Sequence, residues 1–103
     1  MLSSVCTISR VARYLNVSVR TIRNYEAEGF IRIERINGRC YLQPEEVELI
    51  ALITRLRNDL RVNLAGVGAI LEMRQKILDL QKQLDQLKRE IKEQELKNRH
   101  KND

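Results

Sequence analysis

Hydrophobic residues near the start of the chain recur at the spacing of one helix face. They stand at positions i, i+3, i+4 and i+7, namely Ile8, Val11, Ala12 and Leu15. Thr7 directly precedes them, and its hydroxyl can cap the first turn. This pattern predicts a first short helix that begins after Thr7.

A second short helix is predicted after a polar break in the pattern. Ser18 is a suitable N-cap, and the helix would run over residues 19 to about 27, with Ile22 and Tyr25 facing inward. Gly29 supplies the stop, because the residue past a helix end often takes a left-handed conformation. Two short helices separated by a tight turn predict a helix-turn-helix.

The periodicity changes to two between Arg32 and Leu42, on either side of Asn37-Gly38. This dipeptide is the strongest short signal for a hairpin with a two-residue turn. The turn would pair Ile36 with Arg39, Arg35 with Cys40, Glu34 with Tyr41 and Ile33 with Leu42. Cys40 would then point toward the core, and Arg39 and Tyr41 outward. The hairpin is therefore predicted to be the wing of a winged helix-turn-helix over residues 5 to 42.

A third helix is predicted from Pro44 to about Asn58. Proline fits the first helical position because its missing N–H has no partner there. Glutamates at 45, 46 and 48 complement the positive end of the helix dipole. Its apolar residues wrap most of the circumference, so we expect burial against two surfaces.

A long C-terminal helix is predicted after Asn63, which would cap it. Its hydrophobic residues alternate in spacing between three and four over about three heptads. They are Ile70, Met73, Ile77, Leu80, Leu84, Leu87 and Ile91. An exposed aliphatic stripe is costly in water, so we expect a coiled coil that forms a homodimer; a lone solvated helix is the alternative.

These elements predict a mostly α-helical protein in three parts. Residues 1–60 would form the winged helix-turn-helix domain, residues 61–98 the dimerisation helix, and residues 99–103 a frayed tail. The charged residues that flank the stripe leave open whether the paired helices run parallel or antiparallel.

Charge indicates the partner better than composition does. The chain has 103 residues, 4% aromatic residues and a formal net charge of +5. Residues 1–44 hold seven arginines and three glutamates, whereas every lysine comes after residue 75. Arginine suits phosphate groups and guanine edges, so the first half indicates a nucleic-acid partner; solubilising charge alone is the alternative.

Other kinds of site find little support in the sequence. Cys6 and Cys40 form no Cys-x-x-Cys motif and lie far from the single histidine, His100, so we expect no metal and no cofactor. No catalytic cluster or phosphate-binding loop occurs, so we expect no catalytic residues and no enzyme activity. The sequence shows no signal peptide or membrane-spanning stretch, which predicts a cytoplasmic, nucleoid-associated protein without a membrane partner.

Residues at the start of the second helix are the candidates for reading DNA bases. In a helix-turn-helix, this end of the second helix lies in the major groove. The candidates are Ser18, Val19, Arg20, Thr21, Arg23 and Asn24. Arginine can bond guanine through two hydrogen bonds, and asparagine can do the same with adenine.

A second group is expected to hold the DNA backbone without reading sequence. It consists of Arg39 and Tyr41 on the outward face of the hairpin, together with Thr7. Solvated charges with no partner are the alternative for all basic residues of both groups.

Several segments of the chain resemble the MerR family of regulators. They are residues 7–12 (Thr-Ile-Ser-Arg-Val-Ala), residues 17–26 with Gly29-Phe30-Ile31, and residues 37–41 before Glu45-Glu46-Val47. The resemblance covers about residues 6 to 60. It implies a winged helix-turn-helix whose long helices form an antiparallel coiled-coil dimer on a pseudo-palindromic double-stranded promoter site.

Within that family, residues 63–67 with Ile70-Leu71-Glu72 look like the HspR branch and the related CbpM-type modulators. HspR-like proteins act with the chaperone DnaK as co-repressor, which implies a heat-shock repressor. CbpM-like proteins bind a DnaJ-type co-chaperone, which implies a chaperone modulator as the alternative function. A pure protein-binding module would have no need of arginines at 20, 23 and 39.

The sequence also departs from the family pattern. Metal-sensing members carry cysteines around the start of the dimer helix, and this chain has none there. Drug-sensing members carry a further C-terminal ligand domain, which we do not expect here. The wing is short, and Gln43 replaces the usual capping serine before the third helix.

Overall fold

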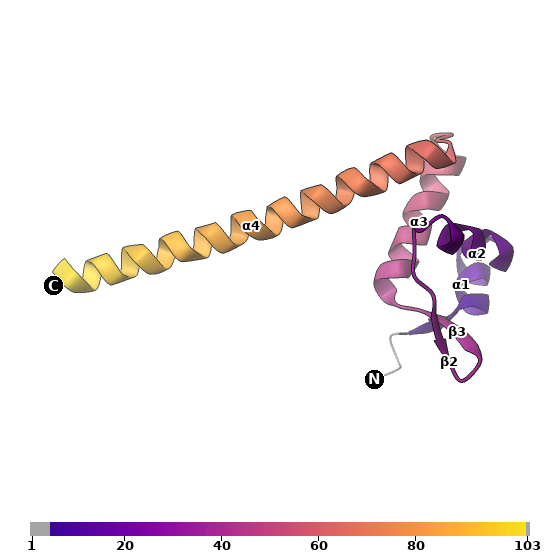
Figure 1. Ribbon diagram of the computed structural model, residues 1–103, viewed down its shortest axis with the longest axis horizontal. Helices are drawn as coiled ribbons and strands as arrows, with labels where there is room; N and C mark the ends of the chain where they lie inside the picture. Colours follow the sequence, from indigo (N-terminus) through magenta and orange to yellow (C-terminus); the bar gives the residue numbers. More distant parts are fainter. Residues whose placement is uncertain (1–4, 103) are drawn as a thin grey trace. The chain divides into compact units, whose positions relative to one another are not determined.

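The computed structural model describes residues 5–102, which form four helices and three short strands in this part of the chain (Figure 1). In chain order they are β1 (Cys6–Thr7), α1 (Ile8–Leu15), α2 (Val19–Ala27), β2 (Glu34–Ile36), β3 (Arg39–Leu42), α3 (Pro44–Asn58) and α4 (Leu64–Asn102). The chain divides into two units, one ending at Gly68 and the other beginning at Ala69. The mostly α-helical fold with a small hairpin is as predicted.

Side-chain caps fix the starts of α1 and α2. The Thr7 hydroxyl accepts a hydrogen bond from the Arg10 backbone N–H at 3.3 Å, and the Ser18 hydroxyl accepts one from the Thr21 N–H at 2.9 Å. Between the helices, Asn16 takes a left-handed conformation with φ 56°. Gly29, with φ +80°, follows the end of α2. The predicted boundaries of both helices are confirmed.

The hairpin has the predicted register. Ile36 pairs with Arg39, Arg35 with Cys40, and Glu34 with Tyr41, while the fourth expected pair falls outside the bounds of β2. Asn37 and Gly38 have φ of 50° and 78°, as a two-residue turn with two positive φ angles requires.

The sheet has a third strand that the sequence did not predict. Its strand order is β1-β3-β2, and β1 pairs antiparallel with β3 through Cys6 with Leu42 and Thr7 with Tyr41. A strand of two residues is too short to show a periodicity of two. The wing is therefore attached to the start of α1 through β3.

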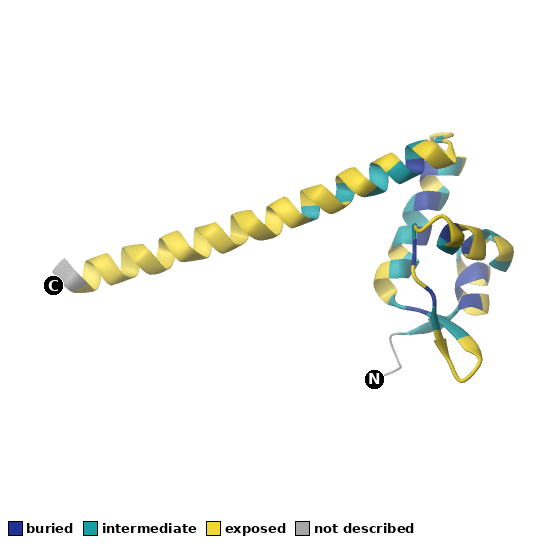
Figure 2. Ribbon diagram, in the orientation of Figure 1, coloured by how far each residue is buried: buried dark blue, intermediate teal, exposed yellow. Residues whose placement is uncertain are grey.

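The core of the first unit is aliphatic, with one tyrosine (Figure 2). Its buried members come from the first three helices, the hairpin region and the first turn of α4. They are Ile8, Val11, Ala12, Ile22, Tyr25, Ile31, Ile33, Leu42, Ile50, Ile53, Leu56 and Val67. The buried positions of α1 and α2 are those that the spacing predicted, apart from Leu15, which is half-buried.

The start of α4 combines a cap with a close packing contact. The Asn63 side-chain oxygen accepts a hydrogen bond from the Gly66 N–H at 2.8 Å, which confirms the predicted cap. A Cβ at Gly66 would lie 2.7 Å from Val62 Cγ1. Glycine lowers helix propensity, but a larger residue at position 66 would come too close to the Val62 side chain.

The second unit is a single exposed helix. Of the seven predicted stripe residues, Met73, Ile77, Leu80, Leu84, Leu87 and Ile91 are exposed, and Ile70 is half-buried. The helix continues through Asn102, so residues 99–102, expected to fray, are helical; Asp103 lies outside the described residues. Lysine and arginine near a helix C-terminus interact favourably with its dipole, which favours the longer helix.

Candidate nucleic-acid interface

Helix α2 buries one face and exposes the other. Ile22 is fully buried and Tyr25 nearly so, which leaves Arg20, Arg23 and Asn24 exposed on the remaining surface. Burial raises the pKa of the Tyr25 hydroxyl, and the positive charge of Arg57 opposes this rise. The helix therefore presents polar hydrogen-bonding groups on its exposed side.

The other three predicted base-reading residues lie at the N-terminus of α2. The Ser18 and Thr21 hydroxyls are 2.8 Å apart, and Ser18 also caps the helix. Val19 and Thr21 are half-buried, and Ser18 is exposed. The structure thus gives Ser18 and Thr21 a local capping role in addition to the role predicted for them.

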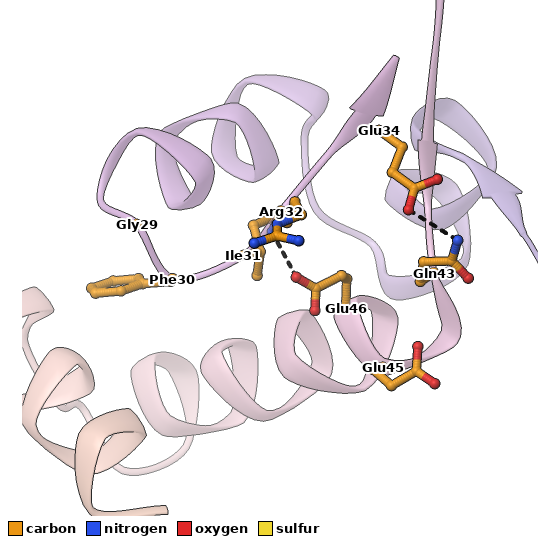
Figure 3. Close-up of a pocket in the computed structure, with 8 residues that line it drawn as sticks. All are labelled: Gly29, Phe30, Ile31, Arg32, Glu34, Gln43, Glu45 and Glu46. Carbon is orange, nitrogen blue, oxygen red and sulfur yellow. Dashed lines mark hydrogen bonds between the residues drawn. The ribbon is translucent and has the colours of Figure 1, made fainter. Parts of the chain in front are cut away.

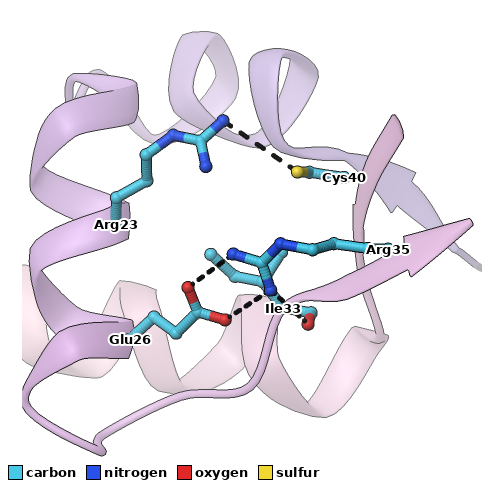
Figure 4. Close-up of polar contacts among 5 residues, drawn as sticks. All are labelled: Arg23, Glu26, Ile33, Arg35 and Cys40. Carbon is cyan, nitrogen blue, oxygen red and sulfur yellow. Dashed lines mark hydrogen bonds and ion pairs between the residues drawn. The ribbon is translucent and has the colours of Figure 1, made fainter. Parts of the chain in front are cut away.

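Arg23 is directed toward the hairpin. Its Nη2 lies 3.9 Å from Cys40 Sγ, which is within the range of a weak hydrogen bond to sulfur (Figure 4). Cys40 is half-buried and shares a sheet face with the fully buried Leu42, as predicted for an inward-pointing residue. Arg23 and Asn24 therefore lie in different surroundings although they are adjacent in sequence.

An ion pair links α2 to β2 next to this contact. Glu26 accepts hydrogen bonds from both terminal nitrogens of Arg35, at 2.9 and 3.0 Å, and Arg35 also reaches the Ile33 carbonyl at 3.4 Å (Figure 4). Hydrogen bonding from Arg35 lowers the pKa of Glu26, while burial opposes this effect. The same pairing raises the pKa of Arg35.

Sequence reasoning missed this pair, although the hairpin register contains a signal for it. Arg35 and Cys40 are direct cross-strand partners, so their side chains must share one face. A register that turns Cys40 inward therefore turns Arg35 toward α2 as well. The acidic partner on α2 could not be found from local pattern, because the contact joins residues that are nine apart in sequence.

The opposite face of the sheet collects the residues predicted to hold the DNA backbone. Thr7, Tyr41 and Glu34 form one row across the three strands, and Arg39 lies two residues from Tyr41 on the same face. Glu34 accepts a hydrogen bond from Gln43 Nε2 at 3.0 Å. The unpredicted strand β1 is what brings Thr7 beside Tyr41.

Two hollows flank the first unit's helices and strands. One, of about 640 Å³, is lined by polar and apolar residues of the α1–α2 turn, α2 and α3, including Ser18, Asn24 and Arg57. The other, of about 390 Å³, lies beside the start of α3, where the Arg32 N–H donates to Glu46 Oε1 at 2.6 Å (Figure 3). Glu34 and Glu45 also line this second hollow.

Neither metal-site nor membrane features occur in the part of the chain that the structure describes. Over residues 5–102, the side chains that could bind a metal ion do not gather in a group of three or more. Within the same residues, every helix is too short or too polar to cross a membrane.

A three-stranded sheet, a helix-turn-helix and a following helix define the first unit as a winged helix-turn-helix. Residues 6–74 match the model of the MerR HTH family regulatory proteins. The chain therefore belongs to the MerR HTH family, whose members are DNA-binding transcription regulators.

Two curated proteins show how far the similarity extends. HspR of Streptomyces coelicolor, a heat shock protein by its name, is 30% identical over 78 residues, which cover 75% of this chain and 52% of HspR. The transcriptional regulator BrlR of Pseudomonas aeruginosa is 39% identical over 54 residues, which cover 50% of this chain and 20% of BrlR. The chain thus spans about half of one relative and a fifth of the other.

A solved structure supports the fold. HiNmlR, a MerR family regulator lacking the sensor domain and bound to promoter DNA, matches with a TM-score of 0.60 and 18% sequence identity. The match covers 84% of this chain and 78% of HiNmlR. At this level of identity, the similarity establishes the shared fold.

Proposed function

We propose that this chain is a homodimeric repressor that binds a specific pseudo-palindromic promoter in double-stranded DNA. The observation that carries the proposal is the exposed face of α2, where Arg20 and Asn24 lie one turn apart opposite the buried Ile22 and Tyr25. Such side chains can form paired hydrogen bonds with guanine and adenine edges in the major groove. HiNmlR, which shares the fold, is bound to promoter DNA.

Each predicted contact residue has a proposed role. The six residues at the start of α2 read bases in the major groove, namely Ser18, Val19, Arg20, Thr21, Arg23 and Asn24. Thr7, Arg39 and Tyr41 hold phosphates from one face of the sheet, which positions the protein without specifying sequence. Arg39 is fully available for this role, because it is exposed on the last strand of the wing.

The exposed stripe of α4 supports homodimerisation. Leu80 is 62% exposed and Leu84 51% exposed, values that are unfavourable for aliphatic side chains in water. The heptad spacing of the stripe is what a second copy of the same helix would cover. Two copies would present two recognition helices, which suits a site with two similar halves.

The similarity to HspR supports a link to heat-shock control. The 30% identity extends over 78 residues and therefore beyond the winged domain into α4. We infer that the repressor acts in the cytoplasm and that a chaperone such as DnaK is its second partner. A modulator that binds a DnaJ-type co-chaperone through its helices is the alternative, and it would leave the arginines of α2 without a function.

Selection of bound fragments from the source genome tests this proposal. The purified chain should enrich a small set of duplexes that share one two-fold sequence near chaperone genes. An Arg20→Ala variant should enrich these duplexes less strongly and with a relaxed preference at one base pair. If no fragment is enriched while a DnaJ-type protein is bound, the chaperone modulator replaces the repressor.

A further inference from the structure

Two contacts between α2 and the wing lie side by side (Figure 4). On α2, Arg23 and Glu26 are three residues apart and so share one side of the helix. On the wing, Arg35 and Cys40 are direct cross-strand partners. Arg23 contacts Cys40, and Glu26 contacts Arg35. Two residues one turn apart on α2 therefore contact two cross-strand partners of the hairpin.

The base of the wing is held by the pairing of β3 with β1 and by the buried Ile33 and Leu42, but its outer part is exposed. β2 has three residues and lies at the edge of the sheet, where it pairs with β3 alone. Residues 35–39 are all exposed. A small hairpin is marginally stable by itself, so its orientation depends on contacts with neighbouring elements. The doubly hydrogen-bonded Glu26–Arg35 pair joins this exposed part of the wing to α2.

We propose that Glu26 and Arg35 are positioning residues that set the distance between the recognition helix and the wing for one DNA site. Arg39 lies on the strand paired with β2, one residue from Cys40, so its position follows that of the clamped strands. The inference rests on the proposed DNA-binding function. Glu26 and Arg35 bind each other and need not touch DNA.

Whether a Glu26 substitution raises or lowers the affinity for DNA distinguishes a positioning role from a simple effect of charge. Removing a carboxylate near DNA should raise affinity if only long-range electrostatics mattered. A positioning role predicts a lower affinity, because a wing released from α2 would spend part of its time away from the DNA phosphates. The loss cannot exceed the strength of the pair itself, and for an exposed ion pair this corresponds to at most about fivefold in affinity for each protomer that contacts the DNA.

The first test compares Glu26→Gln with Glu28→Gln in binding to a duplex selected by the wild-type chain. Glu28 is an exposed carboxylate at the end of the same helix, so it controls for the lost charge. We expect Glu26→Gln to weaken DNA binding by about two- to fivefold for each protomer that contacts the DNA, and Glu28→Gln to leave the affinity unchanged or higher. Arg39→Ala should weaken DNA binding less in the Glu26→Gln background than in the wild-type background, because there the wing already contacts the DNA less often. Equal costs of Arg39→Ala in both backgrounds would overturn the proposal.

The second test needs no DNA. In a Cys6→Ser background, the half-buried Cys40 thiol is the remaining cysteine, and its labelling rate with a disulfide reagent reports how often the wing leaves α2. We expect Glu26→Gln to speed labelling and Glu28→Gln to leave it unchanged. Unchanged circular dichroism would show that both variants fold. Equal labelling rates in all three proteins would mean that the pair does not hold the wing.

The two tests separate failure of this inference from failure of the proposed function. If the wild-type chain binds no duplex, DNA binding fails, and the labelling rates alone decide whether the pair holds the wing. If the wild-type chain binds DNA but Glu26→Gln binds as well or better, the positioning role is wrong and the repressor proposal stands.

Discussion

The hydroxyls of Ser18 and Thr21 lie 2.8 Å apart at the start of α2, and Ser18 Oγ also accepts the Thr21 N–H at 2.9 Å. Both residues are also candidates for contact with bases. One side chain can serve both purposes, because a hydroxyl carries a donor and two acceptor positions. The cap orients the first turn of α2, which is the turn proposed to enter the groove.

Ser18→Ala should destabilise the protein, because the cap is lost and the Thr21 N–H loses its acceptor. We expect a loss of about 1 kcal/mol in the free energy of unfolding. Urea unfolding followed by circular dichroism at a fixed protein concentration measures it, since dimerisation would make stability depend on concentration. Ser9→Ala, at an exposed position within α1, is the control and should change stability much less. Equal losses in the two variants would contradict the capping role.

Arg20→Ala and Arg39→Ala should weaken DNA binding in different ways. A base contact discriminates between sequences, so Arg20→Ala should relax preference at one base pair, with a cost of about 1–3 kcal/mol on the preferred site. A phosphate contact does not discriminate, so Arg39→Ala should weaken all duplexes alike. Affinities for the selected duplex and for single-base variants of it distinguish the two effects.

The control for both arginines is Arg89→Ala, which removes one positive charge from an exposed position on α4. It should leave both affinity and preference nearly unchanged. Equal loss of preference in the Arg20 and Arg39 variants would refute the division into base-reading and backbone-holding residues.

Leu84→Asp should convert the proposed homodimer into monomers. A carboxylate in the middle of an apolar seam would be buried without a partner in the dimer, which is strongly unfavourable. Sedimentation equilibrium measures the mass directly. Leu96→Asp is a matched control, because Leu96 is 53% exposed, close to the 51% of Leu84, but falls outside the predicted stripe. Dimers of the Leu84→Asp variant would show that the stripe is not the dimer seam.

Local signals account for the parts of the fold that the sequence predicted. Thr7 and Ser18 are capping residues directly before apolar-periodic segments, and Asn37-Gly38 fixes both the turn and the register of the hairpin. The strand β1 was missed because two residues carry no periodicity. Residues 99–102 were expected to fray, yet α4 continues through Asn102.

The sequence predicted which residues belong to the candidate site better than it predicted the contacts that these residues make. Arg20, Arg23 and Asn24 are exposed on α2 as the positions of Ile22 and Tyr25 required. The contact of Arg23 with Cys40 and the pairing of Glu26 with Arg35 depend on how the hairpin packs against α2. Such packing joins residues distant in sequence, and no local pattern reports it.

The salt dependence of binding to the selected duplex tests the central claim most directly. A protein that replaces counterions at DNA phosphates loses affinity as salt rises, with a slope in log affinity against log salt of about −0.9 per neutralised phosphate. We predict a steep negative slope for the wild-type chain, and in Arg39→Ala a slope that is less negative by about 0.9 per protomer, because one phosphate contact per protomer is lost. Affinity that does not change with salt, or no binding to any genomic duplex, would contradict it.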